Sequence, residues 1–380
     1  MNPRVALLTT FFRPVVGGVE SNAERLARYL HSIGFDVRVV TKRVTHDLAD
    51  DEDAGGVRVH RRGPYGERNG RGKWRFLPHA AAWLVRHRTE YDVVACIDFR
   101  AIGLAALAAR FMTGRPVLFQ AQTPGVFRWP LTLAYRRPDA LACIGRQIER
   151  EALALGMPRE RVHFLPNPID MAQFRPPTPD ERDDLRRSLG LAPETVACVF
   201  LGRLSLEKGL MDLMEAWGSV RPASATLLVA GPDMDGHAWN VGPAARAFAA
   251  QHGLESVRFL GAAADPAALL RAADLFIQPS HFEAQGLSAV EALASGLPVI
   301  ASATGGLLDF VGDDRNGRLF PPRNVPALAG CLRELIGDRT ARQRLASAAR
   351  ASVEQEYDER AVFDRLAALL RQLSGGSGAR

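Results

Sequence analysis

The sequence lacks the features of disulfide-stapled, zinc-binding and membrane-spanning proteins. It has four cysteines in 380 residues, and no two of them form a C-x-x-C pair: Cys96, Cys143, Cys198 and Cys331. We therefore expect reduced, buried thiols in a cytoplasmic protein rather than a disulfide framework or a metal site. No apolar run approaches the roughly 18 residues that a membrane-spanning helix needs. The apolar segment 5–12 leads into Arg13 and Pro14 rather than a cleavage pattern, so we expect a first strand and not a secretory signal.

The net charge of +6 is unevenly distributed. Residues 1–170 carry 26 Lys and Arg against 17 Asp and Glu, whereas the remainder carries 22 against 25. In the segment Arg58–Arg75 only Glu67 opposes the cations Arg58, Arg61, Arg62, Arg68, Arg71, Lys73 and Arg75. Such a segment forms either a solvated face or a contact with an anionic surface, such as phospholipid or a diphosphate-bearing substrate. We expect no nucleic-acid partner, because no nucleic-acid-binding module accompanies the charge.

Strand-like and helix-like segments alternate through the first part of the chain. Strands are predicted at 4–12, 36–41, 57–61, 91–97, 116–121, 139–144 and 162–165, and an acidic loop at 46–53. Helices are predicted between them, at 20–33, 77–88, 101–111 and 147–155. Repeated β–α alternation indicates a parallel sheet with helices on both of its faces.

A proline-rich stretch, 166–179, interrupts this alternation and is predicted to be an interdomain linker. A second series follows, with strands at 196–201, 226–230, 257–260, 275–278 and 298–301, and then two or three helices between 326 and 373. We therefore predict an α/β protein of two Rossmann-like, doubly wound domains, 1–170 and 171–355, with a ligand cleft between them. Residues 356–373 are expected to form a separate helix, and 374–380 a flexible tail.

The most informative stretch, 278–306, reads QPSHFEAQGLSAVEALASGLPVIASATGG. It predicts a loop after a buried strand, a helix over 288–294 and another strand. Two carboxylates lie eight residues apart, Glu283 in the loop and Glu291 in the helix. Backbone N–H groups at the helix start favour an anion, and they belong to Gly286, Leu287 and Ser288. The alternative is structural: Ser288 and Glu291 form a capping box, and Glu283 is an ordinary solvated acid.

Three other strand ends carry candidate ligand groups. Arg203 and Lys208 follow strand 196–201, and their charges would suit a diphosphate. The simpler alternative is that one of them forms an ion pair with Glu207 at the surface. Gly17 and Gly18 follow the first strand, where their backbone can approach a phosphate or a sugar. They do not form G-x-G-x-x-G, which counts against a dinucleotide-dependent dehydrogenase. Gly231 ends strand 226–230, and the following Asp233-Met-Asp235 is either a metal-binding D-x-D or a polar turn, the interpretation that we favour.

These motifs, in their order and spacing, resemble those of glycosyltransferase family 4, whose members are retaining enzymes of GT-B fold. The resemblance covers most of the chain and rests on residues 17–20, 166–170, 202–209, 229–232, 258–261 and 279–306. It implies a nucleotide sugar bound mostly by the second domain, with no metal. Arg203 and Lys208 would hold the diphosphate, Glu291 the ribose hydroxyls and Glu283 the donor sugar. Backbone groups at 286–288 and at Gly231 would line the donor, Gly17 and Gly18 would close on it, and the last helix would pack back on the first domain.

Two positions depart from the family pattern. A histidine often follows the strand 116–121 in the family, whereas this chain has Gln122, which can donate a hydrogen bond but cannot titrate. A serine often follows the next strand, where Gly145 stands here. The resemblance implies a hexosyltransferase that moves a sugar from a nucleoside-diphosphate sugar to a glycan or lipid-linked acceptor of a surface polysaccharide, in the cytoplasm or on the inner membrane face. A sugar-nucleotide 2-epimerase of the same fold and a non-catalytic partner subunit are the alternatives.

Overall fold

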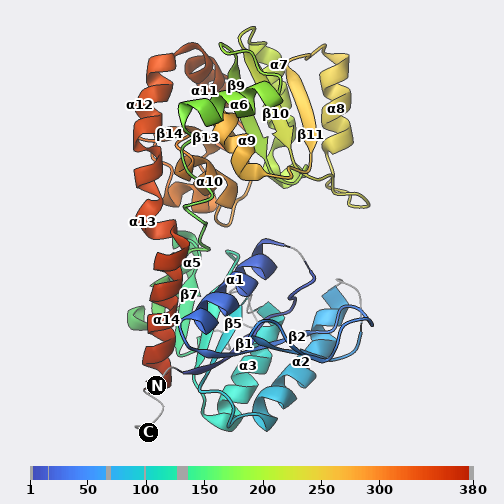
Figure 1. The fold of residues 1–380 in the computed structure, drawn as a ribbon, viewed down its shortest axis with the longest axis vertical. Helices are drawn as coiled ribbons and strands as arrows, with labels where there is room; N and C mark the ends of the chain where they lie inside the picture. Colours follow the sequence, from blue (N-terminus) through green and yellow to red (C-terminus); the bar gives the residue numbers. More distant parts are fainter. Residues whose placement is uncertain (1–2, 16, 66–69, 98–99, 126–135, 376–380) are drawn as a thin grey trace. The chain divides into compact units, whose positions relative to one another are not determined.

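The computed structural model describes residues 3–15, 17–65, 70–97, 100–125 and 136–375, with the backbone alone for 70–73 and 100. The chain divides into two compact units (Figure 1). The first unit comprises residues 1–168 and 360–380, and the second comprises 169–359. Each unit is built on its own parallel sheet, as the alternation predicts.

The described strands of the first unit form an eight-stranded sheet in the order β3-β4-β2-β1-β5-β6-β7-β8. Their bounds are β1 Arg4–Leu8, β2 Asp36–Lys42, β3 Asp51–Asp53, β4 Arg58–Arg62, β5 Val93–Ile97, β6 Val117–Ala121, β7 Ala140–Cys143 and β8 Val162–Phe164. All pairs are parallel except β3 with β4. The central strands are uninterrupted apolar runs, because helices cover both faces of such a sheet.

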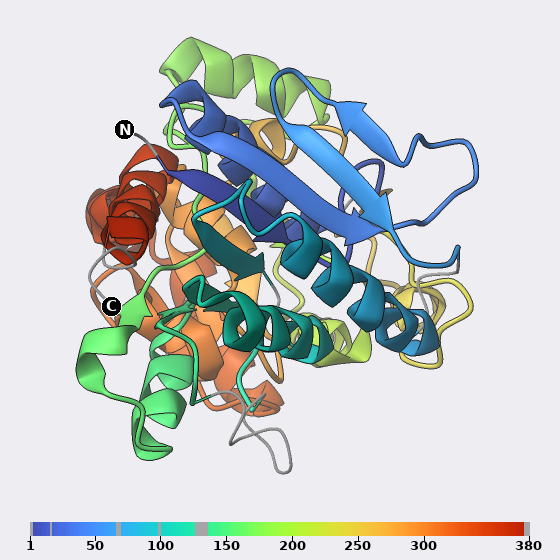
Figure 2. The ribbon, with the colours of Figure 1, turned by 90° about the horizontal axis from the view of Figure 1, so that it is seen from below.

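The described helices of the first unit are α1 Gly18–Ser32, α2 Gly70–Arg86, α3 Arg100–Thr113, α5 Arg146–Ala154 and α14 Glu359–Gly375, with a 3-10 turn η1 at Arg159–Arg161. Helices α2 and α3 lie side by side on one face of the sheet (Figure 2). On the other face, alternate residues of the central strands pack against α1 and α14, as Val5 does against Leu26 of α1 and Phe363 of α14 in one buried cluster. The first and last helices therefore share one core.

The second unit contains a six-stranded parallel sheet in the order β11-β10-β9-β12-β13-β14. Its strands are β9 Val196–Leu201, β10 Ala225–Ala230, β11 Val257–Gly261, β12 Leu275–Gln278, β13 Val299–Ser302 and β14 Gly317–Phe320. Its helices are α6 Pro179–Ser188, α7 Leu210–Val220, α8 Gly242–Gln251, α9 Pro266–Ala272, α10 Leu287–Ala294, α11 Val325–Gly337, α12 Arg339–Ala349 and α13 Glu354–Tyr357. Short 3-10 turns complete it: η2 Leu206–Lys208, η3 Gly305–Asp309 and η4 Arg350–Ser352. The central residues Phe200, Leu227 and Ile277 pack with α7 and α11 in one cluster.

Some expectations about elements are wrong, each for a local reason. Helix α6 was not expected. It begins at the last residue of the proline-rich stretch, because Thr178 and Glu181 form a full capping box and Pro179 occupies the first turn, where its missing N–H costs nothing. The acidic loop contains the strand β3, which pairs with β4. Strand β14 was not expected, and α14 extends to Gly375, so the first two residues of the expected tail are helical. Residues 376–380 of that tail lie outside the described residues.

The expected basic segment is largely neutralised where its side chains are described. In β4, Arg58 pairs with Asp36 at 2.5 Å, Arg61 with Glu52 at 2.7 Å, and Arg62 with Asp51 at 2.6 Å. Strand β3 thus supplies two of the acids that balance the β4 cations. Arg75 is exposed, whereas Arg68 and the side chains of Arg71 and Lys73 lie outside the described residues.

Candidate active site

The candidate residues of the second unit gather at one edge of its sheet. All strands run parallel, so their carboxyl ends share an edge, and this edge is where open α/β sheets bind ligands. Arg203 and Lys208 follow β9, Gly231 follows β10, and Glu283 follows β12. Glu291 lies within α10, the helix that starts from the same edge after β12.

Lys208 and Glu283, which are 75 residues apart in the sequence, are in direct contact. Lys208 Nζ donates to Glu283 Oε2 at 2.6 Å, and both side chains are largely buried, 18% and 11% exposed. Gln278 Nε2 donates to the same oxygen at 3.0 Å, and Ser280 Oγ lies 3.3 Å from it. Three donors therefore converge on Oε2, while Oε1 has no hydrogen-bond partner among the described residues. Neither Gln278 nor Ser280 was predicted, although both stand in the 278–306 stretch.

The contact between Lys208 and Glu283 depends on close backbone packing between η2 and the loop after β12. Gly209 ends η2 with a φ of 68°, and a Cβ on it would lie 1.9 Å from the Pro279 carbonyl oxygen. No other residue fits such an approach, because the left-handed conformation and the missing volume are both needed. On the other side, the Gly306 N–H donates to the Glu283 carbonyl at 3.0 Å, and a Cβ on Gly305 would lie 1.9 Å from that oxygen.

A second pair ties the same two segments together. The His281 N–H donates to the Glu207 carbonyl at 2.8 Å. The ring Nε2 of His281 lies 2.9 Å from Asp212 Oδ2 in the first turn of α7, and it donates there because a carboxylate only accepts. We call this pair the His281–Asp212 latch. Sequence reasoning missed it, since nothing in the spacing of two residues 69 apart signals the contact.

Arg203 is in a different environment from Lys208. Its Nη2 donates to Glu207 at 2.6 Å, and both side chains are about half exposed, at 51% and 49%. This is the surface pair that formed the simpler alternative, and such a pair contributes little to stability. Arg203 is thus free to exchange Glu207 for a more highly charged anion without disturbing the fold.

The start of α10 differs from the capping-box alternative. The N-cap residue is Gly286, with a φ of 89° and no side-chain cap, and α10 begins at Leu287. Ser288 is therefore inside the helix and cannot cap it. The N–H groups of Leu287 and Ser288 belong to the first helical turn, which has no intrahelical acceptor for them. Glu291 is half-buried one turn further on.

Gly231 packs against the neighbouring strand end. Its φ is 151°, and a Cβ there would lie 1.7 Å from the Gly202 carbonyl oxygen. In the loop that follows, Asp233 pairs with Arg246 of α8 at 2.6 Å. Among the described residues, no group of three or more His, Cys, Asp or Glu side chains is placed to hold a metal ion.

The candidate residues of the first unit surround the end of β6 and the start of α1. Gly17 is the extended N-cap of α1, and Gly18 has open space where a Cβ would be. Gln122, 7% exposed, exchanges two hydrogen bonds with Asn167: Asn167 Nδ2 donates to Gln122 Oε1 at 2.7 Å, and Gln122 Nε2 to Asn167 Oδ1 at 3.3 Å. Asn22 of α1 and Gln120 of β6 donate to the same Asn167 oxygen at 3.0 and 3.4 Å. Gln122 is therefore a fixed member of a buried amide network.

Gly145 is the N-cap of α5 and offers no side-chain cap. The serine that often stands here in the family would supply one, so the substitution removes a capping hydroxyl. The residue is buried.

Comparisons with known proteins show that the fold is that of a GT-B glycosyltransferase. A family model described as Glycosyl transferases group 1 matches residues 181–352, and one described as Glycosyltransferase Family 4 matches residues 16–173. A D-inositol 3-phosphate glycosyltransferase from Jonesia denitrificans is 30% identical, with 96% of this chain and 95% of that protein aligned. The chain therefore belongs to glycosyltransferase family 4.

Solved structures share the fold over nearly the whole chain. Sucrose-phosphate synthase from Thermosynechococcus elongatus superposes with a TM-score of 0.81 at 21% identity, covering 98% of this chain and all of that one. HepE from Anabaena, in complex with UDP and glucose, has a TM-score of 0.77 at 23% identity, covering 97% of this chain and all of that one. These likenesses show the fold of both sheets.

Proposed function

We propose that this glycosyltransferase moves a hexosyl group, with retention of configuration and without a metal, from a nucleoside-diphosphate sugar to a hydroxyl of a glycan or lipid-linked acceptor. The observation that carries the proposal is the contact of Lys208 with Glu283 at the carboxyl edge of the second sheet. In this proposal Lys208 is the cation for the leaving diphosphate, and Glu283, in contact with it, is the carboxylate for the sugar. The backbone packing at Gly209 and Gly305 holds the two side chains in register.

The cations would stabilise the leaving group. A nucleoside diphosphate gains negative charge as the glycosidic bond breaks, and fixed cations can balance that charge where other enzymes use a metal ion. Lys208 is nearly buried, so its interaction with a phosphate is only weakly screened. Arg203 would leave Glu207 and contribute a second charge-assisted contact.

The carboxylates would orient the donor. Glu283 keeps Oε1 available while Oε2 is held by three donors, so it can accept a hydrogen bond from a sugar hydroxyl without moving. Glu291, half-buried in α10, is proposed to accept from the ribose hydroxyls. The N–H groups at 286–288 and the backbone at Gly231 would complete the donor site. We retain Gly17, Gly18 and Gln122 as proposed donor-side residues of the first unit.

Gln122 favours one route for the acceptor proton. Glutamine has no titratable group, and the buried amide network fixes its side chain. We propose that the acceptor hydroxyl attacks C1 of the donor sugar on the face that the diphosphate leaves. The C1–O bond to phosphate breaks, the C1–O bond to the acceptor forms, and the acceptor proton passes to a phosphate oxygen.

The acceptor is the least constrained part of the proposal. The name of the Jonesia relative gives D-inositol 3-phosphate as its acceptor. For this chain we propose a sugar hydroxyl of a surface polysaccharide or its lipid-linked precursor, and inositol 3-phosphate belongs in the test as the alternative.

The test is product analysis with UDP-, GDP- and ADP-sugars, each with EDTA and a panel of acceptors that includes inositol 3-phosphate. We expect a new glycoside with the anomeric configuration of the donor, and Glu283→Gln should abolish it. Conversion of the donor without an acceptor would instead identify a 2-epimerase. Donor binding with no turnover on any acceptor, and no effect of Glu283→Gln on biological activity, would identify a non-catalytic partner subunit. Activity that appears only when Mn²⁺ is restored would overturn the metal-free mechanism.

We also propose contact with an anionic membrane surface at the cytoplasmic side, but through fewer cations than the segment Arg58–Arg75 suggested. The cations of β4 are paired, so the attraction would come from the start of α2, where Trp74 is 55% exposed and Arg75 is exposed beside it. No helix of the described part of the chain is long and apolar enough to cross a membrane. Co-sedimentation with anionic liposomes at low salt tests the contact, and Trp74→Ala with Arg75→Glu should abolish it. Equal sedimentation of the wild type and this variant would contradict the proposal.

A further inference from the structure

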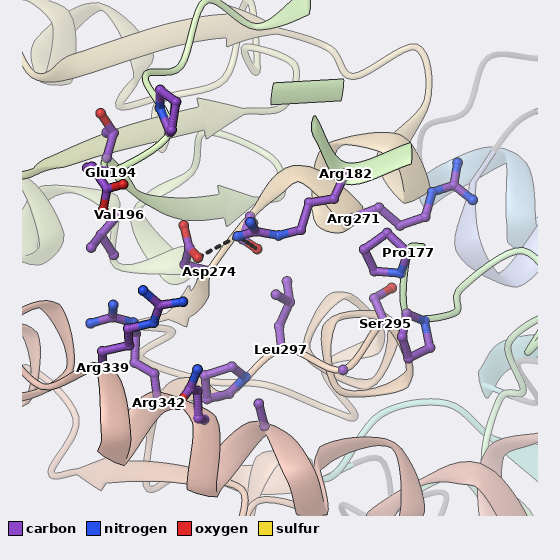
Figure 3. Close-up of a pocket in the computed structure, with 18 residues that line it drawn as sticks. Pro177, Arg182, Glu194, Val196, Arg271, Asp274, Ser295, Leu297, Arg339 and Arg342 are labelled. Carbon is purple, nitrogen blue, oxygen red and sulfur yellow. Dashed lines mark hydrogen bonds and ion pairs between the residues drawn. The ribbon is translucent and has the colours of Figure 1, made fainter. Parts of the chain in front are cut away.

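The second unit has a cavity at the opposite edge of its sheet from the candidate active site. It has a volume of about 540 Å³ and is lined at the amino ends of β9, β12 and β13 (Figure 3). In a parallel sheet the amino ends share an edge, just as the carboxyl ends share the edge that carries Lys208 and Glu283. Helix α12 closes one side of the cavity with Arg339 and Arg342. A cavity of this volume is in the range that holds a small metabolite.

The cavity wall has an excess of positive charge. Four arginines line it, Arg182, Arg271, Arg339 and Arg342, against two carboxylates, Asp274 and Glu194. The carboxylate of Asp274 already has its charge and hydrogen-bonding partners. It accepts hydrogen bonds from Arg182 at 2.5 Å, from the buried Arg186 at 2.9 Å and from the Ala197 N–H at 2.8 Å. Arg271 lies 3.3 Å from Glu181, which is outside the cavity lining.

Two arginines of α12, Arg339 and Arg342, have no carboxylate partner among the described residues. Arg342 Nη1 donates only to the carbonyl oxygens of Leu335 and Ile336, at 2.6 and 2.8 Å, which leaves its charge unbalanced. Arg339 makes no hydrogen bond or ion pair within the described ranges of the chain. The two residues are one helical turn apart, and both side chains extend from α12 toward Val196 and Asp274 (Figure 3). Two neighbouring guanidinium groups are suited to a phosphate, which can accept several N–H bonds at once.

We propose that this cavity binds a phosphorylated small molecule with free hydroxyl groups, such as a sugar phosphate. Arg339 and Arg342 hold the phosphate. Glu194, which is exposed and the one lining carboxylate without a cationic partner among the described residues, accepts hydrogen bonds from the hydroxyls together with Thr195 and Gln343. Because the cavity and the Lys208–Glu283 contact are at opposite edges of the sheet, this ligand is distinct from the donor, and both can be bound at the same time.

The experiment is calorimetry with ribose 5-phosphate as the probe, and ribose and inorganic phosphate as controls. The wild type should bind ribose 5-phosphate, bind inorganic phosphate more weakly and not bind ribose. The double variant Arg339→Ala/Arg342→Ala should weaken probe binding at least tenfold, whereas Arg339→Lys/Arg342→Lys should retain part of it. Arg333→Ala, an exposed arginine of α11 outside the cavity, is the matched control and should change nothing. Glu194→Gln should tighten the binding of inorganic phosphate, because it removes the unpaired carboxylate.

A second set of measurements separates this site from the donor site. Saturating nucleoside diphosphate should leave the affinity for ribose 5-phosphate unchanged, and so should Lys208→Ala. The double arginine variant loses the two hydrogen bonds from Arg342 to the α11 carbonyls, so its melting temperature should fall only slightly, and it should bind nucleoside diphosphate as the wild type does. The proposal would be overturned if the wild type did not bind the probe, or if the double arginine variant bound it fully. It would also be overturned if nucleoside diphosphate competed with the probe, or if Lys208→Ala lost probe binding.

Discussion

At the scale of single residues, Lys208 and Glu283 form a mutually dependent pair. Each is nearly buried and each has the other as its oppositely charged neighbour, at 2.6 Å. Removing one partner of such a pair leaves the other charge buried and uncompensated. The two should therefore differ sharply from Arg203 and Glu207, which are half exposed and can be separated at little cost.

Lys208→Ala is expected to weaken nucleoside-diphosphate binding by the loss of one charge-assisted contact, about 1.5–3 kcal/mol. Glu283→Gln should leave that affinity nearly unchanged and abolish turnover, because the carboxylate is proposed to contact the sugar and not the diphosphate. Binding is measured by calorimetry and turnover with a saturating acceptor. Glu207→Gln is the matched control: it frees Arg203 from its partner and should not weaken binding. Unchanged affinity in both Lys208→Ala and Arg203→Ala would remove the phosphate assignment.

The individual residues also show where sequence reasoning ends. Glu283, Lys208 and the glycines were predicted, since chemistry at strand ends has a recognisable order and spacing. Gln278, His281 and Asp212 were not predicted, because their contacts depend on how a loop packs against a helix start. The partner of Gln122 was also unpredicted: Asn167 is 45 residues away and reaches it only in the folded unit.

At the scale of elements, the His281–Asp212 latch joins the loop after β12 to α7. This loop carries Glu283, whereas Lys208 is the last residue of η2, directly before α7. The latch touches neither proposed substrate group, so its effect is on positioning. A misplacement of about 1 Å at a reacting centre can lower the rate on the order of a hundredfold.

Asp212→Asn and His281→Ala should each lower kcat by roughly ten- to a hundredfold. Nucleoside-diphosphate affinity should change far less, because Lys208 and Arg203 stay on their own segment. His281→Gln, which can still donate a hydrogen bond to Asp212, should recover part of the lost kcat. Glu215→Gln, an exposed acid of the same helix, is the control. A drop in melting temperature with an unchanged kcat would assign the latch a purely structural role.

A second element-scale contact makes a pH-dependent contribution to stability. Asp139, just before β7, accepts two hydrogen bonds from Arg110 of α3, both at 2.7 Å, and one from the Val117 N–H at 2.9 Å. Burial alone would raise the pKa of Asp139, but these hydrogen bonds and the Arg110 charge outweigh it and lower the pKa below its usual value. A carboxylate with a lowered pKa in the folded state stabilises the protein above its unfolded pKa, about 3.9. That stabilisation is lost as the pH falls through the folded pKa.

Asp139→Asn should therefore reduce the free energy of unfolding at pH 7 by about 1–3 kcal/mol, the cost of losing charge-assisted hydrogen bonds. The difference from the wild type should start to shrink below about pH 4, where the carboxylate of the unfolded chain takes up a proton, and should disappear only below the lowered pKa of the native carboxylate. Urea unfolding at several pH values measures this difference. Asp47→Asn, an exposed acid, should show neither effect. A destabilisation that stays constant down to pH 2 would show that the altered packing of the side chain, and not the loss of its charge, is responsible.

Elements also differ in how well the sequence predicts them. The central strands were predicted because buried parallel strands are continuous apolar runs bounded by turns. Helix α6 was missed because its one proline, Pro179, was assigned to the linker, although proline is tolerated in the first turn of a helix. Strand β3 was missed because its three residues are all exposed acids, which do not show the alternation of apolar and polar residues typical of a strand. They form a strand because β4 pairs with them through its backbone and its arginines.

At the scale of the whole molecule, the first unit depends on the end of the chain. Helix α14 contributes Val362, Phe363, Leu366, Leu369 and Leu370 to the core that α1 and the first sheet form, and all five are at most 7% exposed. Complete burial of one such side chain contributes about 1.5–3 kcal/mol, so the five together contribute on the order of 10 kcal/mol as an upper bound. That amount is comparable to the whole stability of an ordinary domain, about 5–15 kcal/mol.

Truncation after Glu359 should therefore abolish the cooperative unfolding of the first unit and expose an apolar face, although no residue before 168 is changed. Calorimetry should show a missing transition, and the dye ANS should bind. Truncation after Gly375 is the control and should leave both signals as in the full chain, because none of the described core residues follows it. Phe363→Ala is a milder test, with an expected loss of about 3–5 kcal/mol in one transition only. Two undisturbed transitions in the chain that ends at Glu359 would show that the first sheet and α1 form a sufficient core without α14.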